Sequence, residues 1–314
     1  MEPLVTVLIP AFDAEHTIAR ALHSVLIQHY PALEIIVIDD ASRDATSAIV
    51  KQFDDERIRL ISLSQNLGVS GATNAGLAAA KGEFVAFLDA DDEWLPGKIE
   101  KQVAVMFGRS DMSLVTCDCA FASVDIQRFS GEPPAVPETE YWRAYLLESR
   151  VAKSCAFARR SSLTAVGPFN QKLLIAEDQD MWIRLALIGA VGHVPETLVV
   201  RHDTEGSLTK RYAAREAEFI LPMIENHVEA QAHRLSSAER RRILGSRYAV
   251  VGRNLYRSGA CLPGLRFLAK ASLFGCDPLG NAWYILTASP PAQRLKHLLH
   301  RRPDRTGVGA TVRR

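Results

Sequence analysis

The chain has 314 residues, of which 47% are hydrophobic and 23% are charged. This length accommodates one large α/β domain and a smaller appendage, and the composition is that of an ordinary globular protein. The formal net charge of +1 excludes a strongly basic nucleic-acid-binding protein, so no nucleic-acid partner is expected. The five cysteines are odd in number and irregularly spaced, which excludes a disulfide framework.

Short apolar runs alternate with helical patterns through the first 90 residues. Strands are predicted over 4–10, 34–40, 58–62 and 83–89, and helices over 17–28, 46–53 and 70–81. The run 34–40 shows no polar alternation, as expected for a strand covered on both faces. The simplest arrangement is a doubly wound sheet with right-handed crossovers, which binds ligands at the carboxyl ends of its strands.

The rest of the chain is predicted in less detail. Residues 95–107, 141–147 and 178–188 have helical patterns, 114–122 and 198–200 read as strands, and 130–140 reads as a surface loop. Three more helices are predicted over 211–233, 238–258 and 262–275, with a kink or break at Pro222. These patterns predict an α/β domain over 1–209, a helical region over 210–302 and a disordered tail over 303–314.

The N-terminal residues bear on the cellular location of the protein, and the cysteines bear on whether it binds zinc. The chain starts without a basic segment or a cleavage site, and no stretch reaches the roughly 18 apolar residues that span a bilayer. We therefore expect a cytoplasmic protein. Cys117 and Cys119 lie in an apolar run and have no second pair at zinc-ligand spacing, so we expect them to pack in the core.

Two adjacent carboxylates, Asp39 and Asp40, close the predicted strand 34–40. Ser42 and Asp44 behind them suit the start of the next helix, where such side chains accept backbone N–H bonds. Capping does not account for the pair itself, because neighbouring carboxylates at the end of a buried strand repel each other. The pair therefore predicts a ligand, a metal or a base edge nearby, with a capping turn as the alternative.

Three acids in four residues, Asp89, Asp91 and Asp92, follow the predicted strand 83–89. Hard cations such as Mg²⁺ take oxygen ligands and are often held by one or two carboxylates together with phosphates. The sequence D-x-D at a strand end therefore indicates a metal–diphosphate site. The alternative is a solvated acidic turn that caps the helix 95–107.

Acids also begin the helix 178–188, and a histidine follows the strand 198–200. Glu177 and Asp178 could supply a general base at the mouth of the sheet, or could form an acidic first turn that the helix dipole favours. His202 could bind a metal or phosphate, or could be a structural histidine.

Five segments together resemble the family 2 glycosyltransferases of the GT-A fold. They are IPAFDAE (9–15), VIDDASRD (37–44), the N-L-G and N-A-G triplets within 66–76, FLDADD (87–92) and EDQDMWIR (177–184). Each segment alone is weak, but their shared order and spacing are specific, and the match covers about two thirds of the chain. The resemblance implies a GT-A fold, a Rossmann-like doubly wound mixed sheet, followed by a C-terminal helical extension.

The resemblance also implies a role for each matching residue. It assigns the nucleotide pocket to Pro10, Ala11, Asp13, Glu15, Asp39, Asp40, Asn66, Gly68, Asn74, Asp89 and Ala90. Within that set Asp40 contacts uracil. Asp91, with His202 near it, ligates Mn²⁺ or Mg²⁺, and Asp178, flanked by Glu177, is the general base.

The implied reaction moves a sugar, with inversion, from a nucleoside diphosphate donor to a hydroxyl of a saccharide or lipid-linked acceptor. A UDP-sugar donor and a role in cell-surface polysaccharide or glycoconjugate synthesis are expected. Two departures from the family pattern leave the donor open: Asp13 stands where Asn is usual, and Thr73 stands where Arg often precedes the second Asn.

Two alternative functions are a nucleotidyltransferase and a catalytically inactive binding protein of the same fold. A nucleotidyltransferase is expected to carry a Gly-rich basic phosphate loop after the first strand, but residues 11–15 contain no Gly and two acids. A catalytically inactive binding protein of the same fold is disfavoured by the intact acids at 89, 91 and 178. Basic and apolar residues are mixed over 262–302, which suits either packing on the catalytic domain or peripheral contact with the inner face of a membrane.

Overall fold

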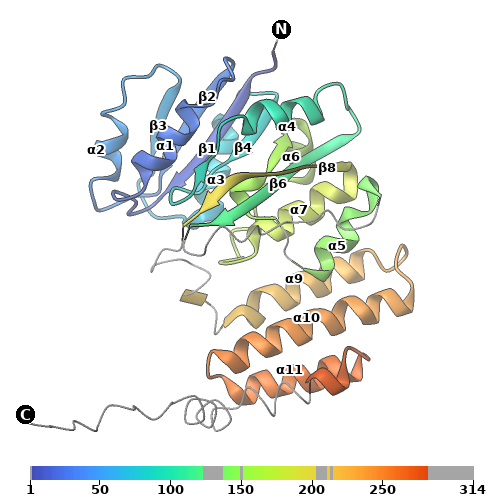
Figure 1. Cartoon of the computed structure of the whole chain (residues 1–314). Helices are drawn as coiled ribbons and strands as arrows, with labels where there is room; N and C mark the ends of the chain where they lie inside the picture. Colours follow the sequence, from blue (N-terminus) through green and yellow to red (C-terminus); the bar gives the residue numbers. More distant parts are fainter. Residues whose placement is uncertain (1, 123–136, 149–150, 203–210, 213–214, 282–314) are drawn as a thin grey trace, which may run out of the picture. The chain divides into compact units, whose positions relative to one another are not determined.

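The computed structural model describes residues 2–122, 137–148, 151–202, 211–212 and 215–281. The chain forms two compact units, Met1–Ser236 and Ser237–Arg314 (Figure 1). The first unit therefore extends beyond residue 209 and includes one helix of the predicted helical region. The predicted disordered tail, 303–314, lies outside the described residues.

A mixed eight-stranded sheet forms the centre of the first unit. Its strands are β1 (Val5–Ala11), β2 (Leu33–Asp39), β3 (Ile58–Ser62), β4 (Phe84–Phe87), β5 (Glu93–Trp94), β6 (Met112–Phe121), β7 (Phe157–Arg159) and β8 (Ala190–Arg201). The order is β3-β2-β1-β4-β7-β6-β8-β5, in which β1 to β4 run parallel and β7 is antiparallel to both its neighbours. This is the doubly wound mixed sheet that the sequence predicted.

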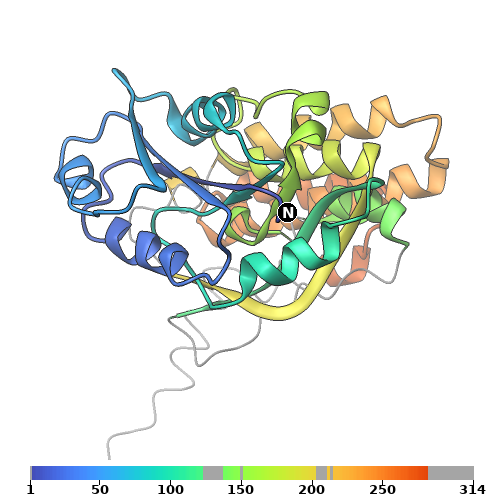
Figure 2. The ribbon, with the colours of Figure 1, turned by 90° about the horizontal axis from the view of Figure 1, so that it is seen from above.

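Helices cover both faces of this sheet (Figure 2). The first unit contains α1 (Ile18–Leu26), α2 (Thr46–Val50), α3 (Gly68–Ala79), α4 (Lys98–Met106), α5 (Tyr141–Leu147), α6 (Arg160–Val166), α7 (Glu177–Ile188) and α9 (Glu216–Ala230), with short 3₁₀ helices η1 (Glu138–Glu140) and η2 (Lys153–Cys155). The helices α1 and α4 lie on one face, and α3 and α7 lie on the other.

Small side chains and aromatic rings set how closely the helices approach the sheet. A Cβ atom added at Gly76 of α3 would lie 2.7 Å from the Ile38 side chain of β2, so glycine permits this contact. On α7 the ring of Trp182 packs against Phe87 at the end of β4, with 5.6 Å between ring centroids. Burial of such rings anchors the start of α7 beside the carboxyl end of β4.

Several elements differ from the sequence prediction. The strand predicted over 198–200 is the end of the twelve-residue β8, whose earlier part contains Gly192, Pro195 and Glu196 and shows no strand pattern. The helix α9 is continuous through Pro222, so no break occurs at the position where a kink or break was predicted. The strand β7 was not predicted, because three residues are too few for a periodic signal, and the seven-residue helix α6 was not predicted either.

The second unit contains a pair of packed helices, α10 (Ser237–Arg257) and α11 (Cys261–Leu273). Gly252 and Gly264 allow their backbones to meet, since a Cβ added at Gly264 would lie 2.8 Å from the Gly252 carbonyl oxygen. Tyr248 stacks on Phe267 across the pair with 6.2 Å between ring centroids. None of the described helices combines the length and the apolar character needed to cross a membrane.

Cys117 and Cys119 are buried free thiols on β6, which confirms the expectation that they pack in the core.

Candidate active site

The loops that follow β1 and β2 are tied together by side chains that accept backbone N–H bonds. The carboxylate of Asp13 accepts the N–H of Arg43 at 2.8 Å, and that of Glu15 accepts the N–H of Ala45 at 2.9 Å. In return Asp44 accepts the N–H of Glu15 at 2.9 Å. The predicted pocket residues Asp13 and Glu15 therefore also hold these two loops together.

Pro10 and Ala11 end β1 and pair in register with the last residues of β2. The carbonyl oxygen of Ala11 accepts the N–H of Asp40 at 2.8 Å, which fixes the turn after β2. These contacts place Pro10, Ala11 and Asp40 at one edge of the sheet, as the sequence predicted for the ends of parallel strands.

The adjacent carboxylates of Asp39 and Asp40 are satisfied by donors of the protein. Asp39 accepts the N–H of Ser42 at 3.0 Å and the hydroxyl of Ser47. Asp40 is buried and accepts the N–H of Leu67 at 2.7 Å. Burial raises the pKa of Asp40, while the N–H groups of Leu67 and Gly68 oppose that rise. Donors of the protein thus satisfy the pair, and its contact with a nucleotide stays a prediction.

Asn66 and Gly68 form the turn that supplies the donor to Asp40. The Asn66 side chain donates to the Asp40 carbonyl oxygen at 3.2 Å and accepts the N–H of Gly68 at 3.2 Å. Gly68 has a φ of 73°, in the left-handed region that glycine adopts without strain. Both residues thus shape the predicted nucleotide pocket through its backbone.

Asn74 of α3 makes two hydrogen bonds away from that turn. Its amide accepts the N–H of Phe169 at 2.8 Å and donates to the Phe169 carbonyl oxygen at 2.9 Å. The structure therefore places Asn74 against the loop between α6 and α7. Its assignment to the nucleotide pocket stays a prediction, since these two hydrogen bonds of its amide hold this loop.

The D-x-D turn follows β4, with Asp89, Ala90 and Asp91 half-buried. The guanidinium of Arg20 on α1 donates to the carbonyl oxygen of Asp91 at 2.6 Å, and the Asp89 N–H donates to the Ser154 hydroxyl at 3.1 Å. The backbone of the turn is thus held from two sides. The carboxylates of Asp89 and Asp91 lie where a cation with phosphate ligands could reach them.

Asp92 has a different environment from the other two acids of this turn. Its carboxyl group is buried, accepts the Ser154 hydroxyl at 2.6 Å and the His202 N–H at 3.3 Å, and lies 3.9 Å from the Arg201 guanidinium. Burial, and then the charge of Asp89, raises the pKa of Asp92 to about 7. Asp92 therefore links the turn to η2 and to the end of β8.

His202 approaches the same turn through its backbone. Its buried Nε2 atom lies 3.7 Å from the carboxylate of Glu93, beyond hydrogen-bond distance. Among the residues that the structure describes, no group of three or more His, Cys, Asp or Glu side chains is arranged to hold a metal ion. Two half-buried carboxylates fit a hard cation that takes its remaining ligands from donor phosphates and water.

Asp178 lies in the first turn of α7, after Ala176, which has a φ of 62°. Its carboxylate accepts the N–H of Gln179 at 2.7 Å. Burial, and then the charge of Glu177, raises the pKa of Asp178 to about 7, while the ammonium of Lys153 acts in the opposite direction. A carboxyl group with a pKa near neutrality suits general base catalysis.

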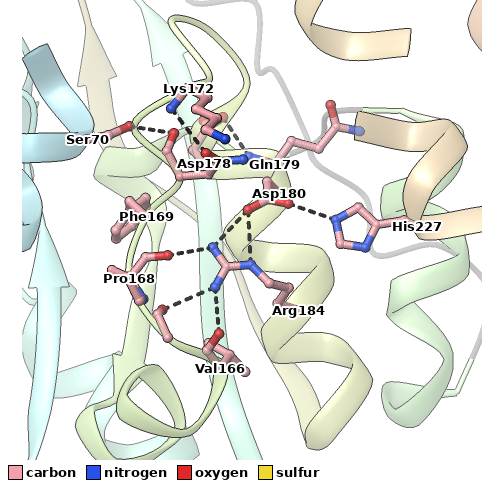
Figure 3. A network of polar contacts seen from close by, with 12 residues as sticks. Ser70, Val166, Pro168, Phe169, Lys172, Asp178, Gln179, Asp180, Arg184 and His227 are labelled. Carbon is pink, nitrogen blue, oxygen red and sulfur yellow. Dashed lines mark hydrogen bonds and ion pairs between the residues drawn. The ribbon is translucent and has the colours of Figure 1, made fainter. Parts of the chain in front are cut away.

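Asp180, also in the first turn of α7, holds this helix to its surroundings (Figure 3). It accepts a hydrogen bond from Nε2 of His227 on α9 at 2.8 Å and pairs with Arg184 at 2.8 Å. Arg184 also donates to the carbonyl oxygens of Val166 and Pro168 at 2.9 and 3.1 Å. The motif 177–184 thus combines Asp178 with the residues that fix its helix.

Sequence reasoning missed several residues that contact the acids. They are Arg20, Lys153, Ser154 and Arg201, and each is separated in sequence from the acid that it contacts. Arg201 stands next to the predicted His202, which was the one signal that could have pointed to it. Lys153 and Ser154 lie in η2, which has no recognisable pattern.

The comparisons with known proteins agree with this fold and identify a family. The family model "Glycosyl transferase family 2" matches residues 6–167. The chain belongs to this family, and its class is that of a glycosyltransferase.

Three relatives illustrate how far the similarity reaches. TuaG of Bacillus subtilis (strain 168), named for teichuronic acid biosynthesis, is 40% identical over 42% of this chain and 51% of its own length. WfgD of Escherichia coli, a UDP-Glc:alpha-D-GlcNAc-diphosphoundecaprenol beta-1,3-glucosyltransferase, is 31% identical over 58% of this chain and 69% of its own length. The solved structure of the mannosyltransferase PcManGT from Pyrobaculum calidifontis, in complex with GDP-Man and Mn²⁺, resembles this chain with a TM-score of 0.60 at 19% identity. The superposition covers 95% of this chain and 84% of the PcManGT chain. The chain thus spans about half the length of the first of these relatives, and the solved structure supports the fold alone.

Proposed function

We propose that this protein transfers a sugar, with inversion, from a UDP-sugar to a hydroxyl of a saccharide or lipid-linked acceptor. The observation that carries the proposal is the convergence of two motifs on one segment, η2: the D-x-D turn after β4 contacts Ser154, and the first turn of α7, which contains Asp178, contacts Lys153 through Glu177. A nucleoside diphosphate held at the D-x-D turn and an acceptor beside Asp178 would then meet at the carboxyl ends of the strands.

In the proposed reaction Asp178 accepts the proton of the acceptor hydroxyl as its oxygen attacks the anomeric carbon of the donor. The bond between that carbon and the diphosphate oxygen breaks, and the nucleoside diphosphate leaves with the electron pair. Asp89 and Asp91 are the carboxylates that would hold Mn²⁺ or Mg²⁺. When bound, this cation would neutralise charge that develops on the diphosphate.

The names of the relatives support the acceptor class. WfgD is named for transfer to a diphosphoundecaprenol-linked sugar, and TuaG is named for the synthesis of teichuronic acid. We therefore propose a lipid-linked or saccharide acceptor in cell-surface glycan synthesis for this chain. We also propose that residues 1–209 carry the reaction in the cytoplasm.

Peripheral membrane contact through the C-terminal helices is a further part of the proposal. In the second unit Leu262, Leu273 and Leu279 are largely exposed, with 65%, 88% and 86% of their surface accessible. Flotation of the full chain with anionic liposomes tests this contact, and a Leu262→Ser/Leu273→Ser/Leu279→Ser variant is the comparison. Equal flotation of both proteins would reject it. The other apolar and basic residues proposed for this contact, from residue 282 on, lie outside the described residues.

A donor panel tests the central part of the proposal. UDP-glucose, UDP-galactose, UDP-N-acetylglucosamine and GDP-mannose are each incubated with the protein and Mn²⁺ or with EDTA, and release of the nucleoside diphosphate is measured. We expect metal-dependent release with at least one UDP-sugar. Absence of release and of metal-dependent nucleotide binding would favour an inactive binding protein, and pyrophosphate release from UTP and a sugar phosphate would favour a nucleotidyltransferase.

A further inference from the structure

Lys153 is a buried lysine that lies among the acids of the site. Its side chain is 3% exposed, and its Nζ lies 3.1 Å from the Glu177 carboxylate and 5.6 Å from the centre of the Phe169 ring. Burial alone would lower the pKa of Lys153, but the charges of Glu177, Asp89 and Asp178 outweigh it and raise the pKa. The side chain therefore carries a positive charge inside the protein.

The next residue connects the same segment to the other acid motif. The Ser154 hydroxyl donates to the Asp92 carboxyl group at 2.6 Å and accepts the Asp89 N–H at 3.1 Å. The 3₁₀ helix η2 thus contacts the D-x-D turn through Ser154 and the first turn of α7 through Lys153. The two motifs that this segment connects are about 85 residues apart in sequence.

The charges around Lys153 are unbalanced. One ammonium interacts with the three acids Glu177, Asp89 and Asp178, which come from α7 and from the end of β4. Like charges at this separation disfavour ionisation of one another, and a nearby cation favours it. Lys153 is therefore the group that offsets the repulsion between Asp178 and Glu177.

We propose that Lys153 is a positioning residue for the transfer step, because its ammonium holds the first turn of α7 beside the end of β4 and stabilises the negative charge of Asp178. The proposal rests on the proposed function of Asp178 as the base. It assigns to Lys153 an effect on turnover and none on the affinity for the donor nucleotide.

The test must separate this effect from simple loss of the fold. Lys153→Met alone leaves the buried Glu177 carboxylate unpaired, which is strongly destabilising. The substitution is therefore also made in a Glu177→Gln background, where the carboxylate that pairs directly with Lys153 is removed as well. Lys98→Met is the matched control, because Lys98 is the other buried lysine of the described chain and its ammonium bonds to the Gln102 amide at 2.7 Å instead of to an acid.

Four measurements are made on each full-length variant: the thermal unfolding midpoint, the Kd for UDP with Mn²⁺, and kcat and KM for hydrolysis of the best donor of the panel. We expect the Lys153→Met/Glu177→Gln protein to fold and to bind UDP within twofold of Glu177→Gln. Its kcat should be at least about tenfold lower than that of Glu177→Gln. Lys98→Met should keep kcat within twofold of the unsubstituted protein.

Equal kcat values for Glu177→Gln and the double variant would overturn the proposal, as would an equal loss of kcat in Lys98→Met. A double variant that does not fold would also overturn it, because the ammonium would then be required for the fold itself. An Asp178→Asn variant measured in parallel separates the proposal that Asp178 is the base from the proposal that Lys153 positions it. Full turnover in Asp178→Asn would refute the proposed base, whereas a Lys153 result alone would leave that base intact.

Discussion

Two clusters of acids at the edge of one sheet have opposite environments. The first acid cluster, Asp13, Glu15, Asp39, Asp40 and Asp44, lies on the loops after β1 and β2, and each carboxylate accepts hydrogen bonds from backbone or hydroxyl donors. The second acid cluster, Asp89, Asp91, Asp92, Glu177 and Asp178, lies around η2, and its members interact with one another.

The difference shows which acids are available for chemistry. In the first acid cluster hydrogen bonds fix the loops and favour the charged carboxylates, although burial raises the pKa of Asp40. These carboxylates therefore have a structural role whether or not a nucleotide is bound. In the second acid cluster, burial and mutual repulsion raise the pKa of Asp92 and of Asp178 to about 7. Perturbed carboxyl groups of this kind are typical of catalytic sites.

The largest expected effect is that of Asp178→Asn, in the second acid cluster. An amide cannot accept the acceptor proton, so kcat should fall by about a thousandfold, within the range known for general base catalysis. The Kd for UDP with Mn²⁺ should stay within twofold. Steady-state kinetics and calorimetric titration measure the two quantities, and a kcat near that of the unsubstituted protein would contradict the assignment.

Asp91→Ala should have the next largest effect. Removal of this carboxylate should weaken Mn²⁺-dependent binding of UDP by about a hundredfold, because a hard cation loses one of its few protein ligands. Titration of UDP in the presence of Mn²⁺ and of EDTA measures the change. Asp54→Ala, at an exposed acid remote from both clusters, is the control and should leave the Kd unchanged.

The pH dependence of turnover should follow the second acid cluster. Because the pKa of the proposed base, Asp178, is raised to about 7, kcat/KM should fall about tenfold for each pH unit below that value. Above pH 7 the carboxyl group is ionised and the rate should level off. A profile that stays flat between pH 5 and 7 would contradict a base with this pKa.

Asp44→Ala should have the smallest effect on turnover and a measurable effect on stability. Asp44 accepts the N–H groups of Thr46 and Glu15 at 2.9 Å, so its loss should lower the free energy of unfolding by about 1 to 2 kcal/mol. Because Asp44 belongs to the first acid cluster and has a structural role, kcat should stay within twofold of that of the unsubstituted protein. Denaturant unfolding and donor kinetics measure the two effects. A large loss of kcat would contradict the assignment of a structural role to the first acid cluster and a catalytic role to the second.

The sequence predicted those parts of the fold that have periodic local signals. The helix over 141–147 and the strand over 58–62 have the predicted limits, because their apolar residues alone mark them. The strand β8 was predicted as three residues instead of twelve, since Pro195 and Glu196 interrupt the apolar pattern. Pairing with the long strand β6 overrides this local signal.

The candidate site was predictable as a set of acids and not as a set of contacts. Asp91 and Asp178 stand in motifs that can be found by their order in the chain. The opposite environments of the two clusters depend on partners that are distant in sequence, such as Leu67 for Asp40 and Lys153 for Glu177. No local pattern specifies such a partner, because only the fold brings it into contact.

The most direct test of the central claim is the anomeric form of the sugar that is first released from the best donor of the panel, with water as the acceptor. Proton NMR at early times, before mutarotation, identifies this form. For an α-linked UDP-sugar we predict that the β-anomer appears first, and that its appearance is slowed about a thousandfold in Asp178→Asn. Initial release of the α-anomer, or an unchanged rate in that variant, would contradict inverting transfer with Asp178 as the base.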